Sequence, residues 1–152
     1  MNKITWGFGP HLTLDMWRCD KKKLTDLTHV YFLLDSLPEK IGMTKIAPPQ
    51  VLSYPGKEGS FDRGGITGFV LISESHITIH TFENQAHAFV DIFSCKNFDV
   101  DYAVDILIKA FDAKNHKTTV SNRGHEFPKE VPFVREFVKQ ERNTVQNDKK
   151  EN

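Results

Sequence analysis

Three short runs of β-branched and aromatic residues in the middle of the chain constrain its fold more than any other feature. The runs span residues 68–73, 76–81 and 86–94, and short polar breaks separate them. Val, Ile, Thr and Phe favour strands, and runs of this length with such breaks are typical of consecutive strands in one sheet. The sequence therefore predicts an antiparallel meander at the centre of a sheet.

Two amphipathic segments flank the meander and predict helices. After Asp20, a candidate N-cap, apolar residues recur at helical spacing up to about residues 38–42. Residues 100–111 repeat this spacing behind a second candidate cap, Asp99. Residues 54–65 are rich in Gly, Ser and charge and predict a long loop. Further strands are expected over residues 11–16, 43–46 and 117–121. Two helices would then cover one sheet.

Size, charge and cysteine content limit the classes of protein that fit. With 152 residues and 39% hydrophobic content, one domain is expected over residues 1–139, followed by a polar tail at residues 140–152. Lys plus Arg equals Asp plus Glu at 20 each, so no net field favours nucleic acid. No apolar run approaches the roughly 20 residues that span a membrane, and a cytoplasmic protein is expected. Cys19 and Cys95 have no CxxC neighbour, which argues against a disulfide framework or a zinc knuckle.

Glu74 and Ser75 lie in the break between the first two runs, and His76 and His80 lie in the second run, which is an unusual set of polar groups for such apolar strand sequence. A zinc site at His76 and His80 fails on distance, because four strand residues span about 13 Å and ligands lie ~2 Å from one ion. Ser75 and His80 are an odd number of residues apart and would face opposite sides of a continuous strand. Ser75 is therefore expected at a tight turn over residues 73–75, which would also strain the bond before it.

Three motifs occur here at characteristic spacing: Thr-Gly at Thr67, Glu-Ser-His-x-Thr-x-His-Thr from Glu74, and Asp-x-Phe-Ser-Cys ending at Cys95. In this combination the sequence resembles the prokaryotic S-adenosylmethionine decarboxylase family, from about residue 11 to residue 128. The resemblance implies an α+β fold, a two-layer α/β sandwich whose mainly antiparallel sheet is covered on one face by helices. It also implies a homodimer with sites at or near the interface.

In that family the chain cuts itself, and the matching bond here lies between Glu74 and Ser75. The resemblance thus implies a β chain of residues 1–74 and an α chain of residues 75–152 that begins with a pyruvoyl group made from Ser75. An imine to such an electron-poor carbonyl accepts the electrons left by decarboxylation, a role that pyridoxal phosphate fills elsewhere. Neither a pyridoxal phosphate site nor a metal site is expected. The implied product is decarboxylated S-adenosylmethionine, the aminopropyl donor for spermidine synthesis.

The resemblance also assigns roles to other residues. His80 would remove the α-proton of the modified serine, Cys95 would return a proton to the substrate, and Thr67 would assist processing. Phe61 would stack on the adenine of the substrate. Each residue also has a plainer explanation if taken alone: a turn-forming Ser75, a core His80, a small buried Cys95, a strand-favouring Thr67 and a core Phe61. Cys19 is assigned to the buried, structural class.

The sequence departs from the family at Asn84, which stands where relatives carry a glutamate. The resemblance implies that this glutamate accepts hydrogen bonds from the ribose hydroxyls of the substrate. An amide there would weaken a charge-assisted hydrogen bond by on the order of 1 kcal/mol. One alternative is therefore the same pyruvoyl chemistry on arginine or ornithine. A second is a regulatory homologue that never cuts itself. A serine hydrolase fits less well, because no Gly-x-Ser-x-Gly elbow surrounds Ser75.

Overall fold

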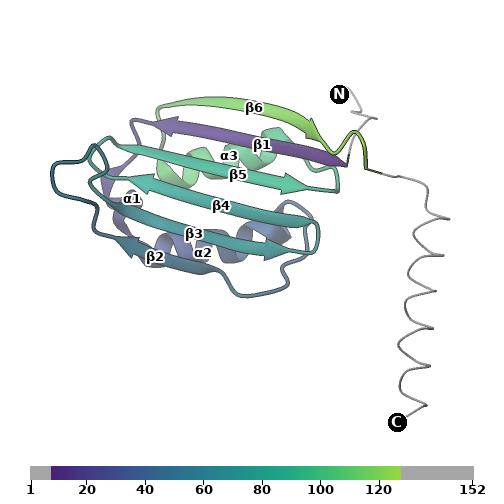
Figure 1. The fold of residues 1–152 in the computed structure, drawn as a ribbon, viewed down its shortest axis with the longest axis horizontal. Helices are drawn as coiled ribbons and strands as arrows, with labels where there is room; N and C mark the ends of the chain where they lie inside the picture. Colours follow the sequence, from purple (N-terminus) through teal and green to yellow (C-terminus); the bar gives the residue numbers. More distant parts are fainter. Residues whose placement is uncertain (1–7, 128–152) are drawn as a thin grey trace, which may run out of the picture.

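Six strands form one antiparallel sheet in the order β2-β3-β4-β5-β1-β6 (Figure 1). The computed structural model describes residues 8–127. The strands are β1 (Gly9–Trp17), β2 (Gln50–Tyr54), β3 (Gly65–Ile72), β4 (Ser75–Phe82), β5 (His87–Ser94) and β6 (Asn115–Arg123). The expected meander is confirmed as β3, β4 and β5. Strand β1 then pairs with β5, which brings the start of the described chain beside the end of the meander.

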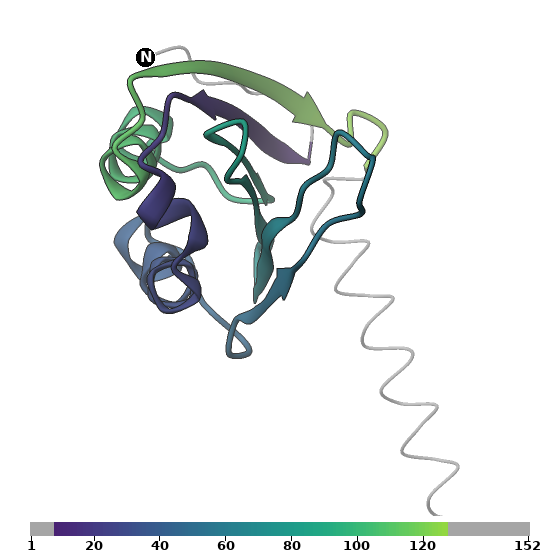
Figure 2. The same ribbon diagram turned by 90° about the vertical axis from the view of Figure 1, so that its left-hand side faces the viewer.

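Three helices in the described part of the chain pack against one face of this sheet: α1 (Lys21–Thr25), α2 (Leu27–Lys40) and α3 (Val100–Phe111). All of them lie behind the sheet in Figure 1 and on one side of it in Figure 2. This is the expected two-layer α+β sandwich. Because every helix covers the same face, the other face of the sheet carries no helix in the described residues.

Aspartate side chains cap the N-termini of the helices and fix where they begin. Asp20 accepts a hydrogen bond from the backbone N–H of Lys22 at 2.8 Å, and Asp99 accepts one from Tyr102 at 3.0 Å, as the sequence predicts. The single helix expected after Asp20 is wrong, because Asp26 interrupts it. The Asp26 carboxylate accepts from the His29 N–H at 3.0 Å and starts α2, so one amphipathic pattern is divided into α1 and α2.

The strand expected over residues 43–46 is also wrong. Within that segment Lys45 forms only an isolated bridge with Ile72, and the strand that pairs with β3 is β2, after the two prolines. Proline has no N–H to donate to a sheet, so regular pairing begins only beyond Pro49. Strand β2 lies at the sheet edge and is mostly exposed, and it therefore lacks the alternating pattern by which a half-buried strand is identified.

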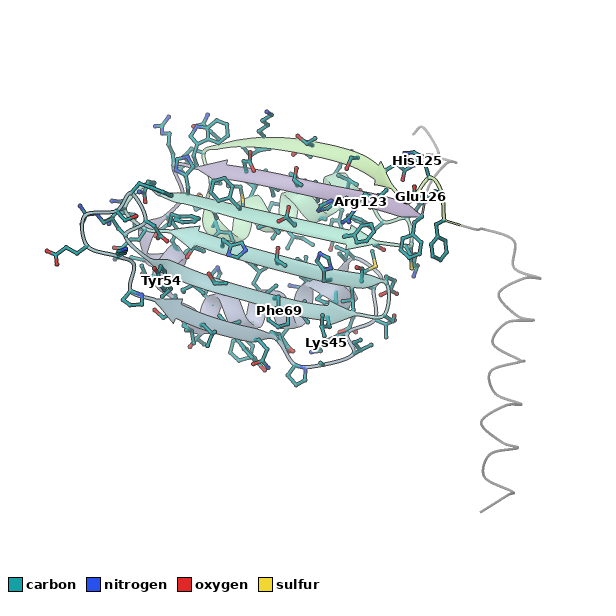
Figure 3. All side chains as sticks on the ribbon, in the orientation of Figure 1. Lys45, Tyr54, Phe69, Arg123, His125 and Glu126 are labelled. Atoms are coloured by element: carbon teal, nitrogen blue, oxygen red, sulfur yellow. The ribbon has the colours of Figure 1, made fainter. Side chains whose placement is uncertain are left out.

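The core lies between the helices and the sheet. Alternate strand residues, such as Leu12, Ile77 and Ile79, are fully buried there against helix residues that include Phe111. The side chains between them point to the opposite face, which Figure 3 shows toward the viewer. We call this the open face. Its exposed large apolar side chains are Leu52, Tyr54, Phe69, Leu71 and Phe89. No helix in the described part is both long and apolar enough to cross a membrane.

Candidate active site

The hairpin between β3 and β4 contains the bond that the sequence predicts to be cut. Ile72 pairs with Ser75, which leaves Ser73 and Glu74 as a two-residue turn and confirms the expected tight turn. Two-residue hairpins usually need a positive φ at the first or at both turn residues, yet here the positive φ, 154°, falls on Ser75. Such a backbone conformation is rare outside glycine and stores strain. The strain lies at the residue that follows the predicted cleavage bond.

Hydrogen bonds hold both the side chain and the backbone carbonyl of Glu74, the residue before this bond. Its side-chain Oε2 accepts from the backbone N–H of Thr44 at 3.0 Å. Burial raises the pKa of the Glu74 carboxyl, but hydrogen bonds, led by the one from Thr44, lower it by more. The pKa of Glu74 therefore lies below its ordinary value. The Glu74 carbonyl oxygen accepts from the backbone N–H of Cys95 at 3.0 Å. This donor polarises the carbonyl and could stabilise negative charge on its oxygen.

The hydroxyl of Ser75 contacts a histidine to which the sequence analysis gave no role. Ser75 Oγ lies 3.1 Å from His76 Nδ1. The His76 ring packs against Phe93, with ring centroids 5.9 Å apart. We call Glu74, Ser75, His76 and Cys95 the cleavage end of the site. Of the residues predicted from the sequence, the structure thus brings together Glu74, Ser75 and Cys95.

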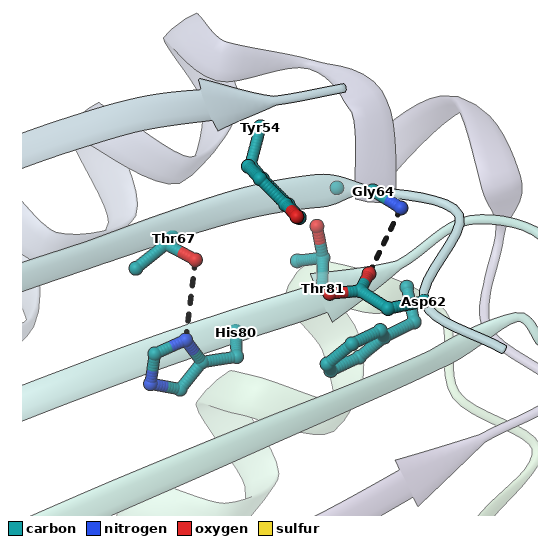
Figure 4. Close-up of a pocket in the computed structure, with 8 residues that line it drawn as sticks. Tyr54, Asp62, Gly64, Thr67, His80 and Thr81 are labelled. Carbon is teal, nitrogen blue, oxygen red and sulfur yellow. Dashed lines mark hydrogen bonds between the residues drawn. The ribbon is translucent and has the colours of Figure 1, made fainter. Parts of the chain in front are cut away.

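Thr67 and His80 form a second group on the open face. They are direct partners in the β3–β4 register, and Thr67 Oγ1 lies 3.3 Å from His80 Nδ1 (Figure 4). The next residue, Thr81, points to the helix side, where its hydroxyl donates to the Leu24 carbonyl at 2.8 Å. This buried bond between β4 and α1 keeps His80 on the open face. His80 is therefore not a core histidine.

A cavity of about 280 Å³ adjoins the Thr67–His80 pair and includes two residues that the sequence analysis missed, Tyr54 and Asp62 (Figure 4). Asp62 lies in the loop between β2 and β3, where its Oδ1 accepts from the Gly64 N–H at 3.0 Å. A loop carboxylate has no periodic pattern to single it out, although its place directly after Phe61 was a usable signal.

Phe61 and Asn84 lie at the same end of the sheet as His80. The Phe61 side chain is 85% exposed, so it does not fill the core. Its carbonyl accepts from the Gln85 side-chain Nε2 at 2.8 Å, which ties the loop to the exposed turn that contains Asn84. We call Phe61, Thr67, His80 and Asn84 the far end of the site.

The two ends are too far apart to act together within one chain. Ser75 and His80 are five residues apart on β4, which at ~3.3 Å per residue is about 16 Å. The bend at Ser75 turns its hydroxyl toward His76 and does not bring it to His80. Within one chain the residues predicted from the sequence therefore fall into two separate groups.

The two cysteines differ sharply, which allows a chemical test. Burial raises the pKa of Cys19 to about 11, whereas Cys95 is exposed. Because the thiolate is the reactive form, fewer than about one Cys19 in a thousand is reactive at pH 7.5. We expect iodoacetamide to label Cys95 at least about a hundredfold faster than Cys19, as measured by peptide mass spectrometry. Equal labelling would contradict the buried position of Cys19, and a Cys95→Ser chain should lose the fast labelling.

A two-layer α+β fold with a candidate nucleophile, Ser75, beside a strained hairpin turn indicates that the protein is an enzyme. Residues 10–124 match the sequence model of S-adenosylmethionine decarboxylase. An S-adenosylmethionine decarboxylase proenzyme from Anoxybacillus flavithermus is 32% identical over 123 residues, covering 76% of this chain and 87% of that protein. S-adenosylmethionine decarboxylase proenzyme 2 from Bacillus anthracis is 37% identical over 105 residues, covering 66% of this chain and 79% of that protein.

A solved structure is similar as well. The crystal structure of the adenosylmethionine decarboxylase from Aquifex aeolicus matches with a TM-score of 0.64 and 28% identity, covering 79% of this chain and 93% of that one. The chain therefore belongs to the S-adenosylmethionine decarboxylase family, a family of enzymes.

Proposed function

We propose that this chain is the precursor of a pyruvoyl-dependent S-adenosylmethionine decarboxylase that cuts itself between Glu74 and Ser75. The observation that carries the proposal is the hairpin itself, in which a strained Ser75 follows a carbonyl that accepts a hydrogen bond from the Cys95 N–H. The relatives are named as proenzymes, which favours self-processing over a silent regulatory homologue. Their common substrate likewise favours S-adenosylmethionine over arginine or ornithine.

Self-processing would proceed in three chemical steps. The Ser75 hydroxyl attacks the Glu74 carbonyl carbon, and the amide becomes an ester with a free Ser75 amine. His80 then removes the α-proton of Ser75 while the ester leaves as the Glu74 carboxylate. Thr67, hydrogen-bonded to His80, would orient the imidazole for this step. Hydrolysis of the resulting dehydroalanine releases ammonia and leaves a pyruvoyl group at residue 75. That group supplies an electron sink for loss of the carboxylate.

The position of Cys95 supports a role in the last proton transfer of decarboxylation. Its side chain is exposed, and its backbone lies beside residue 75 through the hydrogen bond to Glu74. A thiol there can deliver a proton to the α-carbon of the substrate after carbon dioxide leaves. We therefore propose Cys95 as the general acid. The plainer explanation, that Cys95 is a small residue buried in the core, does not fit its exposed position.

We infer that two copies of the chain complete each site. The cleavage end and the far end lie about 16 Å apart on β4, yet the proposed chemistry needs both at one serine. In such a dimer the open faces of two copies would stack on each other, related by a two-fold axis that crosses β4 between its ends. This symmetry would bring the far end of one copy to Ser75 of the other. The exposed apolar side chains of the open face, which include Phe69 and Leu71, would be buried in this homodimer.

The far end would bind the nucleoside. Phe61 offers an exposed aromatic face for adenine or for the sulfonium cation. Asn84 lacks the negative charge of the glutamate that it replaces, and the carboxylate that lines the cavity beside His80 belongs to Asp62. We propose that Asp62 supplies the charged hydrogen-bond acceptor for the ribose hydroxyls, with the product serving as an aminopropyl donor for polyamine synthesis.

The proposal is tested by the intact mass of the denatured protein after reductive trapping with cyanoborohydride. S-adenosylmethionine, arginine and ornithine are supplied together at equal concentration. We expect two fragments that meet between Glu74 and Ser75, the C-terminal one carrying an adduct of decarboxylated S-adenosylmethionine.

Each other outcome has a defined meaning. An adduct of an amino-acid size would shift the substrate to arginine or ornithine while leaving the pyruvoyl chemistry in place. A single uncut chain after prolonged incubation would overturn the proposed function. Omitting cyanoborohydride provides the control, since the same fragments should then appear without the adduct.

A further inference from the structure

His76 contacts the one atom that must lose a proton before the chain can cut itself. Its Nδ1 lies 3.1 Å from Ser75 Oγ, within hydrogen-bond distance. A serine hydroxyl is a weak nucleophile, and an adjacent base activates it. With the ring proton on Nε2, the Ser75 O–H donates to Nδ1, and His76 is then set to accept that proton.

The contact depends on the unusual backbone at Ser75. Neighbouring residues in a regular strand point to opposite faces, so their side chains do not normally meet. At φ 154° the Ser75 hydroxyl instead reaches the ring of the next residue. The same conformation therefore strains the hairpin and brings nucleophile and base together.

The surroundings of His76 hold its ring in this position. The ring packs on Phe93 at an interplanar angle of 59°, and the Arg123 guanidinium lies over the Phe93 ring, 4.2 Å from its centroid. His11 packs against Phe93 too, with centroids 5.6 Å apart. Phe93 thus forms a shared aromatic support, and a supported ring keeps its nitrogen aimed at the hydroxyl.

His80 does not provide this first proton transfer in the same chain, because it lies about 16 Å along the strand. Its proposed step also differs in kind, since it removes a proton from carbon after the ester has formed. Self-cleavage takes a proton from oxygen in one step and from carbon in the next, and His76 is the histidine that lies beside the oxygen within the same chain.

We propose that His76 is the general base, and then the general acid, of the first step of self-cleavage. This inference rests on the proposed function. The proton of Ser75 Oγ moves to His76 Nδ1 as the Oγ–C bond to Glu74 forms, and the Cys95 N–H stabilises the negative charge on the carbonyl oxygen. The C–N bond then breaks, and His76 returns the proton to the departing Ser75 nitrogen. One bond forms, one breaks, and nothing is oxidised or reduced.

The test compares precursor cleavage in His76→Ala, His76→Asn and His80→Ala chains, followed over time by intact mass. We expect both His76 variants to cut about 100-fold to 10,000-fold more slowly than the unmodified chain. Because they stall before the ester, hydroxylamine should not cut them. The His80→Ala chain should stall after the ester and be cut by hydroxylamine.

Asparagine separates a chemical role from a structural one. Its side-chain oxygen can accept the same hydrogen bond from Ser75 but cannot take up a proton. Cleavage of His76→Asn near the unmodified rate would overturn the proposal, as would rapid cutting of His76→Ala by hydroxylamine. Added imidazole should accelerate His76→Ala by at least about tenfold.

A matched control is available on the same face. His87 bonds to the Gln85 carbonyl through Nδ1 at 2.6 Å and stacks on Trp17, far from the hairpin along β5. His87→Ala should cut at the unmodified rate. If the unmodified chain itself failed to cut, the proposed function would be at fault, whereas normal cutting by His76→Ala would remove only the inference about His76.

Discussion

The Ser75→Ala chain is expected to remain a single uncut polypeptide, with decarboxylation at least about a thousandfold below that of the unmodified protein. The substitution removes the oxygen that attacks Glu74 and also the atom from which the pyruvoyl group is made. No other residue can replace it, because the attacking oxygen must be bonded to the Cβ of residue 75 to form a five-membered ring with the preceding carbonyl carbon. Intact mass measures the cleavage, and release of labelled carbon dioxide measures the decarboxylation.

Ser73 provides the matched control for this experiment. It lies in the same turn, and its backbone N–H donates to the Thr44 carbonyl at 2.8 Å, a bond that Ser73→Ala keeps. The Ser73→Ala chain should therefore cut at a rate within a few-fold of the unmodified chain. Fragments from the Ser75→Ala chain that meet between residues 74 and 75 would refute the assignment of the cleavage site.

Co-expression of Ser75→Ala and His80→Ala chains should restore formation of the pyruvoyl group, which neither chain achieves alone. In a mixed dimer, the His80→Ala chain contributes an intact Ser75, and the Ser75→Ala chain contributes an intact His80. If each site combines the two ends from different copies, one of the two sites is complete. With random pairing, up to about half of the His80→Ala chains should then carry the pyruvoyl group.

The measurement is the mass of the C-terminal fragment, in chains distinguished by different tags. A pyruvoyl end differs in mass from the serine end that simple ester hydrolysis produces, so slow background hydrolysis does not interfere. Absence of pyruvoyl in purified mixed dimers would show that His80 acts on its own chain or not at all. The Ser75→Ala chain should stay uncut in every sample, which serves as the internal control.

Local patterns predicted the helices and most strands, and the failures have local causes. The Asp20 and Asp99 caps and the meander were identified from spacing and residue type. The break at Asp26 was missed, because a capping aspartate within an apolar pattern also suits an exposed helix position. Strand β2 was missed because it is an exposed edge strand, with no buried face to impose alternation.

For the site, the motif predicted a set of residues but not how they are arranged. Ser75, His80 and Cys95 were singled out together, as one set. The structure divides them: Cys95 meets the carbonyl before Ser75, and His80 pairs with Thr67 about 16 Å away along β4. Sequence spacing contains no information about which end of a folded hairpin meets which loop.

The strand order of the meander, the turn before Ser75 and the family could all be predicted from the amino-acid sequence, because they depend on residue types at short, fixed spacing. The folded chain was needed to see that the Cys95 amide bonds to the Glu74 carbonyl and that the Ser75 hydroxyl lies against the His76 ring. Both contacts arise from the register between β4 and β5 and from one unusual backbone angle. Register and backbone strain are set by the packing of the whole sheet, which no local pattern specifies.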